Sequence, residues 1–215
     1  MKNILVVGTG RFGRYAIEAL HNLGHQILAI DRHEDRINKI LPMVTSAEIG
    51  DSTDMQFMQT LGVEDFDLCI VAIGDDFLSS LETAAVLKDL GAKKIVARAT
   101  GESQEKLLYR CGADEVVFPE RQLGRWTAIR FSADNIQDYI ELEDGYSILK
   151  VDTPADWSGK SLSSLNLRNL YGMNVLGIEI NGKMNMSISS DTILQTGQDI
   201  MVLGKSEDLQ KVFHY

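Results

Sequence analysis

The glycine-rich turn near the N-terminus constrains the fold of this chain more than any other feature. The apolar run Ile4–Val7 leads directly into Gly8-Thr9-Gly10-Arg11-Phe12-Gly13, and an amphipathic stretch follows. In such a turn Gly8 permits the tight bend, Gly10 lets an anion approach the backbone, and Gly13 allows close packing of helix on strand. The first N–H groups of the helix have no intrahelical partner and attract a phosphate. The segment therefore predicts a strand–turn–helix unit with a phosphate site.

Residues 1–119 alternate between apolar runs and helical patterns. The runs are continuous rather than alternating in polarity, as expected of strands covered by helices on both faces. They are Ile4–Val7, Gln26–Ile30, Thr45–Ile49, Leu68–Ile73, Lys94–Ala97 and Glu115–Phe118. Amphipathic stretches at Arg14–Asn22 and Phe77–Leu90 lie between them, and Gly91 is a suitable helix end. This order predicts an α/β domain with a Rossmann-like, doubly wound parallel sheet over residues 1–119.

The pattern changes after residue 119. We expect a helix over Glu120–Phe131, as part of a connecting helix and linker that covers residues 120–134. Beyond it the apolar runs are shorter and alternate in polarity, which is typical of a sheet with one exposed face. These runs are Ile136–Leu142, Tyr146–Asp152, Val175–Ile180 and Ile200–Leu203, and helices are expected over Ser161–Asn169 and Ser206–Phe213. Asn181-Gly182 predicts a two-residue hairpin. Residues 135–215 are thus expected to form a small α+β domain.

Charge and composition exclude several functions. The chain carries 21 Lys+Arg against 31 Asp+Glu, a net charge of -10, so it is repelled by nucleic acid and by acidic lipid. Its two cysteines, Cys69 and Cys111, are isolated and have no metal or redox spacing. The N-terminal apolar run is too short for a signal peptide, and no run is long enough to span a membrane. We expect a soluble, cytosolic chain whose role at a membrane comes through a partner.

A carboxylate at the end of the second predicted strand strengthens the nucleotide interpretation. Asp31 follows Gly13 by 18 residues, close to the spacing at which Rossmann folds place an acidic residue. A carboxylate there accepts hydrogen bonds from the ribose hydroxyls of an adenosine. It also disfavours a 2′-phosphate and hence NADP, although the neighbouring Arg32 favours one. Arg32 is therefore a second candidate residue at the ribose.

Two side chains lie inside the glycine turn itself. The guanidinium of Arg11 is able to reach a terminal phosphate and form paired hydrogen bonds with it. The alternative for Arg11 is a solvated loop charge. Phe12 is included in the candidate site as its neighbour in the motif.

Further candidates follow the other strands, whose carboxyl ends meet at the same edge of a parallel sheet. They are Asp51, Ser52, Ile73, Gly74 and Arg98. The segment Gly50–Thr53 is expected at the adenine edge, with Thr53 as a plain helix N-cap in the alternative interpretation. Helix capping is likewise the alternative for Gly74–Asp76.

No catalytic constellation is found. Tyr146 and Lys150 have the spacing of a short-chain dehydrogenase pair, but that spacing works on a helix and this segment is predicted to be a strand. His21 and His25 have helical spacing, yet Gly24 interrupts the helix between them. Asn185-Met186-Ser187 has the form of a glycosylation sequon in a chain that nothing exports. We therefore expect a protein that is not an enzyme.

Taken together, these motifs resemble the RCK domain (regulator of conductance of potassium) of KtrA- and TrkA-type subunits, and KtrA most of all. The likeness rests on Gly-x-Gly-Arg-Phe-Gly, the acidic residue after strand two and the Gly-Asp-x-Thr segment. It continues through Val71–Gly74, Gly112–Asp114 and Pro119-Glu120, and includes the connecting helix and the small C-terminal domain. It covers nearly the whole chain, specifically in the first 120 residues and mostly as architecture after them.

The resemblance implies a function and a set of partners. Eight chains are expected to form an octameric ring at the cytoplasmic face of the membrane, docked under a potassium channel subunit of the KtrB or TrkH type. ATP and ADP favour different ring shapes and so gate the channel. By the same resemblance Arg11 contacts the γ-phosphate, Asp31 holds the ribose, and Glu120 lies near a divalent or monovalent cation that accompanies ATP.

Other ligands and functions are kept as alternatives. NAD(H) is an alternative nucleotide, in a small NAD-dependent oxidoreductase or an NADH-sensing regulator. The family also implies cyclic di-AMP in the C-terminal domain. That expectation is the weaker one here, because Asn181–Lys183 and Ser189-Ser190 stand where relatives often carry a basic residue or histidine and a proline.

Overall fold

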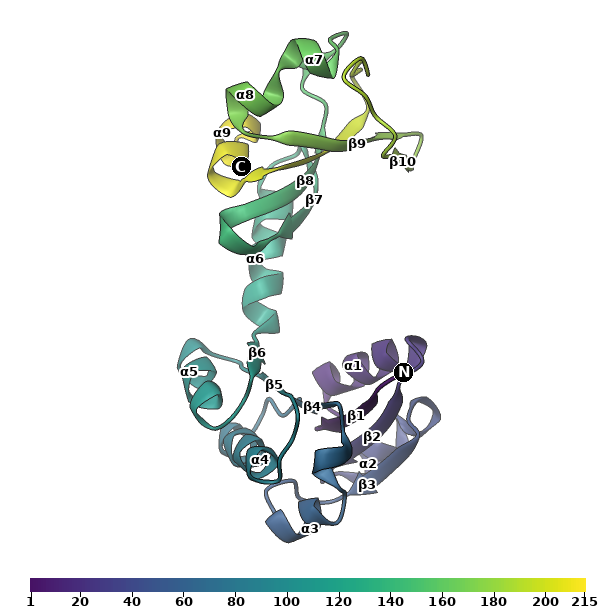
Figure 1. Ribbon diagram of the computed structural model, residues 1–215, viewed down its shortest axis with the longest axis vertical. Coiled ribbons are helices and arrows are strands. Elements are labelled where there is room, and N and C mark those ends of the chain that lie inside the picture. Colours follow the sequence, from purple (N-terminus) through teal and green to yellow (C-terminus); the bar gives the residue numbers. More distant parts are fainter. The chain divides into compact units, whose positions relative to one another are not determined.

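The computed structural model describes residues 1–215, which form two compact units, Met1–Glu120 and Arg121–Tyr215 (Figure 1). The first unit contains a six-stranded parallel sheet in the order β3-β2-β1-β4-β5-β6. The strands are β1 (Asn3–Val7), β2 (Gln26–Asp31), β3 (Ser46–Ile49), β4 (Leu68–Val71), β5 (Ile95–Arg98) and β6 (Glu115–Val117). The strand order reverses between β1 and β4, as in a doubly wound Rossmann sheet. The predicted fold class of this unit is confirmed.

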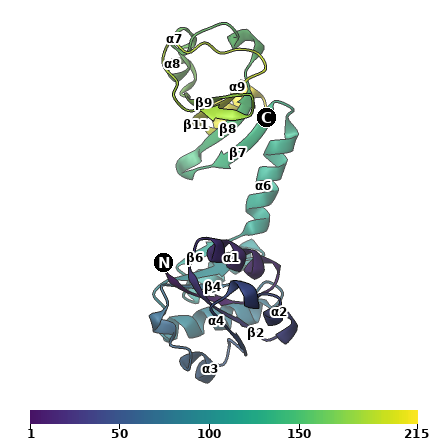
Figure 2. The same cartoon turned by 90° about the vertical axis from the view of Figure 1, so that its right-hand side faces the viewer.

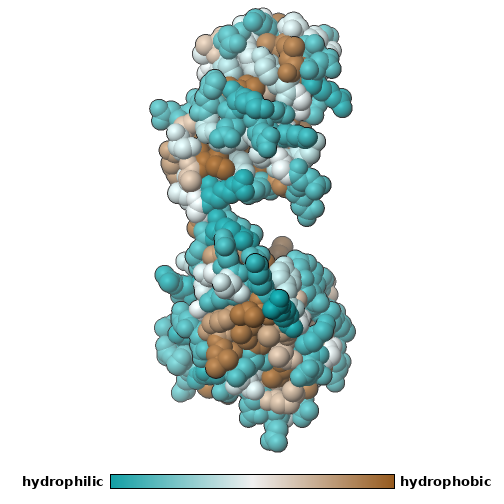
Figure 3. Space-filling view, turned by 90° about the vertical axis from the view of Figure 1, so that its left-hand side faces the viewer, coloured by the Kyte–Doolittle hydropathy of each residue, from teal (hydrophilic) through white to brown (hydrophobic).

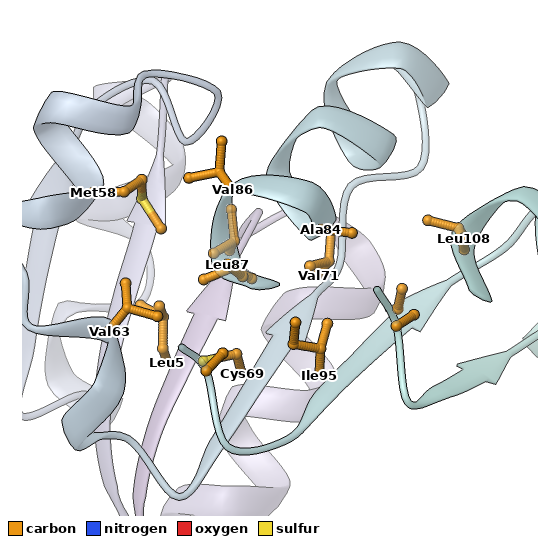
Figure 4. Packing of buried hydrophobic residues seen from close by; sticks show 14 of the residues in the cluster. Leu5, Met58, Val63, Cys69, Val71, Ala84, Val86, Leu87, Ile95 and Leu108 are labelled. Carbon is orange, nitrogen blue, oxygen red and sulfur yellow. The ribbon is translucent and has the colours of Figure 1, made fainter. Parts of the chain in front are cut away.

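Helices cover both faces of this sheet. They are α1 (Arg11–Asn22), α2 (Glu34–Asn38), α3 (Met55–Gln59), α4 (Phe77–Asp89) and α5 (Glu102–Arg110) (Figure 2). Because side chains alternate along a strand, Leu5 and Val7 of β1 pack with α3, α4 and α5, whereas Ile4 and Val6 pack with α1 and α2. Figure 4 shows the first of these two layers, in which Leu5 and Cys69 point toward Leu87 of α4. This double burial explains the continuous apolar runs.

The second unit contains a five-stranded antiparallel sheet in the order β10-β9-β11-β8-β7. Its strands are β7 (Ile136–Glu141), β8 (Tyr146–Asp152), β9 (Asn174–Ile180), β10 (Lys183–Asn185) and β11 (Asp199–Lys205). Its helices are α7 (Leu162–Leu165), α8 (Leu167–Tyr171) and α9 (Ser206–Phe213), besides most of α6 (Pro119–Ser132). One apolar core unites Leu149, Trp157 and Phe213, and Trp126 and Ile129 of α6 pack against it. The predicted small α+β architecture is confirmed.

Two details of the second unit concern its turns. Asn181 and Gly182 both have positive φ, 51° and 74°, and join β9 to β10, so the hairpin prediction is confirmed. The single helix predicted over Ser161–Asn169 is wrong. Asn166 adopts the left-handed conformation with φ 48° and separates α7 from α8. None of the helices is long and apolar enough to cross a lipid bilayer.

Candidate nucleotide-binding site

The glycine turn joins β1 to α1 at the point where the strand order reverses. Gly8 has φ +91°, and its N–H donates to the Ile30 carbonyl over 2.8 Å. A Cβ on Gly13 would lie 1.9 Å from the Gly8 carbonyl oxygen, so no other residue fits there. A Cβ on Gly10 would meet nothing within 4 Å. The turn is therefore packed on one side and leaves open space beside Gly10.

The open side lies at the N-terminus of α1, where the helix has no acidic side chain of its own. Gly10 is the N-cap of the 12-residue helix α1 and offers no side chain to its N–H groups, and the first turn contains no acidic residue. The positive end of the helix dipole and the unpaired N–H groups thus remain available. The exposed Arg11 adds a positive charge at the same place. A phosphate fits this arrangement, as the sequence predicts.

Asp31 lies at the end of β2 and is almost fully buried, with 6% of its surface exposed. One carboxylate oxygen accepts hydrogen bonds from the backbone N–H and the hydroxyl of Thr9, at 2.7 and 3.0 Å. The other accepts from the His33 N–H at 2.9 Å. Asp31 therefore holds the glycine turn against the end of β2. Its predicted contact with a ribose stays a prediction.

The neighbouring Arg32 turns toward the loops that follow β3 and β4. One terminal nitrogen donates to Asp51 over 2.8 Å and to the Ser79 hydroxyl over 3.0 Å. The other lies 3.6 Å from a carboxylate oxygen of Asp76. Arg32 thus links the end of β2 to the segments that follow β3 and β4.

The segment after β3 is held by its own side chains. Asp51 accepts hydrogen bonds from the hydroxyl and backbone N–H of Thr53, and the hydroxyl of Ser52 is paired with that of Thr83 at 2.7 Å. Although burial acts against it, the Thr53 hydroxyl, the Thr53 N–H and Arg32 lower the pKa of Asp51 from 3.8 to about 2. The alternative role of Thr53 as helix cap is wrong, because Asp54 caps α3.

Ile73 and Gly74 follow β4 and border the glycine turn. A Cβ on Gly8 would lie 3.1 Å from the Ile73 nitrogen, and one on Gly74 would lie 2.5 Å from a terminal nitrogen of Arg98. The guanidinium of Arg98 also stacks over the Phe12 ring, with its carbon 5.5 Å from the ring centroid. A side chain on Gly74 would thus displace the guanidinium of Arg98. Helix capping in this loop falls to Asp76, which accepts from the Ser79 N–H.

Glu120 pairs with Arg98 at 2.5 Å at the start of α6. Burial alone would raise the pKa of Glu120, but its own backbone N–H, the hydrogen bond from Arg98 and the charges of Arg98 and Arg11 together lower it. Arg11 and Glu120 thus belong to one electrostatic group at this edge. The chain by itself brings together no three His, Cys, Asp or Glu side chains that could hold a metal ion.

The structure therefore places the predicted residues in two groups at the carboxyl edge of the sheet. One group surrounds the turn and contains Arg11, Phe12, Arg98 and Glu120; because the sequence predicts a phosphate there, we call it the phosphate side. The other contains Asp31, Arg32, Asp51 and Ser52, and we call it the adenosine side after the predicted ligand. The sequence analysis missed the contributions of Thr9, Ser79 and Thr83. Thr9 lies inside the motif, and Ser79 follows the capping Asp76 by three residues, so both carried a usable signal.

Sheet order, glycine turn and open helix start together define a Rossmann-type nucleotide-binding fold. Comparison with known proteins specifies it further: the TrkA-N domain family matches residues 4–119 and the TrkA-C domain family matches residues 146–215. This chain belongs to the family of TrkA-N and TrkA-C domain proteins. The predicted resemblance to RCK-type subunits is thereby confirmed.

Curated relatives match almost from end to end. The chain is 32% identical over 210 residues to the Ktr system potassium uptake protein C of Bacillus subtilis (strain 168), covering 98% of this chain and 95% of that protein. Protein A of the same system and organism gives the same identity and coverage. Protein A of Vibrio alginolyticus is 29% identical over 208 residues, which cover 97% of this chain and 94% of that protein.

Solved structures agree on the fold. The GsuK RCK domain has a TM-score of 0.69 at 19% identity and covers 99% of this chain and 47% of its own. The GsuK channel bound to NAD has a TM-score of 0.69 at 19% identity and covers 97% of this chain and 38% of its own. This chain spans less than half the length of those two chains. The TrkA-N domain of the inner membrane protein ybaL from Escherichia coli has a TM-score of 0.55 at 23% identity and covers 60% of this chain and 96% of its own.

Proposed function

We propose that this chain is the nucleotide-binding regulatory subunit of a potassium uptake system, and that it gates a membrane channel subunit in response to ATP and ADP. The observation that carries the proposal is the open, anion-free start of α1 beside Gly10, at the point where the strand order reverses. Similarity to Ktr system potassium uptake proteins over nearly the whole chain supports the physiological role.

The charges around the glycine turn favour a ligand with a terminal phosphate. Arg11 is exposed at the turn, and its charge acts on Glu120 at the start of α6. A third phosphate that engages Arg11, with a cation between it and Glu120, would give ATP and ADP different free energies of binding in two conformations. Only such a difference shifts a conformational equilibrium. NAD(H) is the second candidate ligand, favoured by the likeness in fold to the GsuK channel bound to NAD.

Assembly of several copies into a ring is part of the proposal. Figure 3 shows apolar surface on one face of the first unit, and exposed apolar side chains of that unit include Leu78 in α4 and Leu107 in α5. On α6, Leu123 and Phe131 are 63% and 71% exposed. Large exposed apolar side chains favour protein–protein contact. The octamer, the membrane partner of the KtrB or TrkH type and a cyclic di-AMP site in the second unit stay predictions.

Thermal unfolding with ATP, ADP, NADH and NADPH, each with and without Mg²⁺, tests the ligand. A nucleotide at 100 times its Kd adds about 2.7 kcal/mol to the stability of the unit that binds it. We expect the largest shift with ATP, and we expect Arg11→Ala to narrow the difference between ATP and ADP. Arg14→Ala is the matched control, because Arg14 is an exposed arginine of the same helix. A shift with NADH and none with ATP would contradict the proposal.

Sedimentation with each nucleotide tests the ring. We expect an assembly of several chains in ATP and in ADP, with different sedimentation coefficients for the two. A monomer under both conditions would contradict the gating role, whatever the binding result.

A further inference from the structure

Arg32 occupies the position at which a Rossmann site reads the 2′ group of the ribose. It follows Asp31 directly at the end of β2, where NADP-binding folds place an arginine against a 2′-phosphate. In this chain the guanidinium is already engaged. Both hydrogens of one terminal nitrogen are used, by Asp51 at 2.8 Å and by the Ser79 hydroxyl at 3.0 Å. The second terminal nitrogen faces Asp76 at 3.6 Å.

The carboxylates around Arg32 outnumber its charge. Asp51 and Asp76 contact it, and Glu82 of α4 is close enough to act on it electrostatically. Asp51 is itself fixed by Thr53, and Asp76 by the hydroxyl and N–H of Ser79. A 2′-phosphate placed beside Arg32 would therefore be repelled by these fixed carboxylates, and it would not find a free guanidinium to pair with.

We infer that Arg32, held by Asp51 and Asp76, is a specificity-determining positioning residue that makes the site accept adenine nucleotides with a free 2′-hydroxyl and reject those with a 2′-phosphate. The inference rests on the proposed nucleotide site. The same link ties the loops after β3 and β4 together, so it sets both the shape and the charge of the adenosine side. The site rejects a 2′-phosphate because Arg32 is already paired with Asp51 and Asp76, although an arginine is present at this position.

Arg36 is the other cation near this position. Its terminal nitrogens lie 3.8 Å from Asp31 and 4.0 Å from Asp75, and neither contact is a hydrogen bond. Its charge is opposed by a buried carboxylate, Asp31, and by an exposed one, Asp75. Arg36 therefore serves as the internal comparison for Arg32.

The experiment measures the affinities for ADP and for adenosine 2′-phosphate 5′-diphosphate by calorimetry, in the full-length chain. The two probes differ only in the 2′-phosphate. The test variant is Asp51→Asn with Asp76→Asn, which keeps an acceptor at each position and removes both charges. The matched control is Asp35→Asn with Asp54→Asn, which removes two charges from the same unit without touching Arg32. The ADP affinity of each variant reports that its site is folded.

We expect the wild-type chain to bind ADP more tightly than adenosine 2′-phosphate 5′-diphosphate. In the test variant the ratio of the two affinities should shift toward the 2′-phosphate compound by about tenfold, the size expected from the loss of two half-exposed ion pairs. The control variant should keep the wild-type ratio. Adding Arg32→Ala to the test variant should abolish the shift, and adding Arg36→Ala should not. A purely structural effect would change both affinities together and leave the ratio unaltered.

An unaltered ratio in the test variant, or a shift that survives Arg32→Ala and disappears with Arg36→Ala, overturns the inference alone. Failure of the wild-type chain to bind ADP, ATP or NADH overturns the proposed function and the inference with it.

Discussion

Gly10 and Gly13 of the turn have separable roles, because Gly13 is packed against the backbone and Gly10 is not. A methyl group on Gly13 would meet the Gly8 carbonyl at 1.9 Å, whereas one on Gly10 would point into open space. We expect Gly13→Ala to destabilise the first unit by about 2 kcal/mol or more, as backbone displacement in a packed turn does. Gly10→Ala should retain the stability and lose nucleotide affinity. Chemical denaturation and calorimetry distinguish the two results, and equal stability of both variants would contradict this account of the turn.

Asp51 provides a test of the polar network on the adenosine side. Its folded-state pKa of about 2 lies below the ordinary 3.8, so the group stabilises the fold above about pH 4 and loses that contribution as the pH falls toward 2. We expect carboxyl ¹³C NMR titration to give a value near 2 for Asp51. Thr53→Val and Arg32→Ala should each raise the pKa. An ordinary pKa in the unmodified chain would contradict the hydrogen bonds that Asp51 accepts.

At this scale the sequence predicts which residues meet, but not how their side chains pair. The ends of parallel strands share one edge, and Arg32 and Asp51, which were both expected at that edge, are in contact there. The pairing depends on rotamers in loops that are distant in sequence. No rule of sequence spacing therefore predicts the contact of Asp31 with Thr9 or that of Arg98 with Glu120.

Asn166 illustrates the element scale, because one residue divides what otherwise reads as a single helix. Its left-handed conformation, φ 48°, costs a residue with a Cβ and without a compensating side chain about 1 kcal/mol or more. We expect Asn166→Ala to destabilise the second unit by about that amount and Asn166→Gly to be neutral within about 0.5 kcal/mol. Both variants lose the hydrogen bond from Asn169, so their difference isolates the backbone. Equal stabilities by urea denaturation would show that φ at residue 166 carries no cost.

Prediction of elements succeeded where the pattern is long or carries a specific turn. The 13-residue helix α4 and the hairpin at Asn181-Gly182 are examples, and their bounds agree with the sequence pattern. The five-residue helices α2 and α3 have too few turns to display an apolar period, and the sequence analysis did not identify them. The sequence analysis also missed the division at Asn166, because asparagine is tolerated within a helix as well as in a turn.

On the scale of the whole molecule, the two units have separate apolar cores. Phe213 is 3% exposed in the core of the second unit, and its ring packs edge-on against Trp157 at 5.9 Å. We expect Phe213→Ala to cost that unit about 3–5 kcal/mol. Scanning calorimetry should show its transition at a lower temperature, while the transition of the first unit and the affinity for nucleotide stay unchanged. If both units unfold in one transition, and Phe213→Ala lowers the temperature of that transition, the two cores are not independent.

The distribution of tryptophan has a practical consequence. Both tryptophans of the chain, Trp126 and Trp157, belong to the second unit, and the candidate nucleotide site belongs to the first. Trp126 donates to Asp138 and packs edge-on against Phe131, on the helix whose second residue is Glu120. All indole emission therefore originates outside the unit that contains the candidate site. A change of this emission on addition of ATP or ADP, corrected for absorption by the nucleotide, would therefore be an unlabelled optical signal that the second unit responds to the ligand.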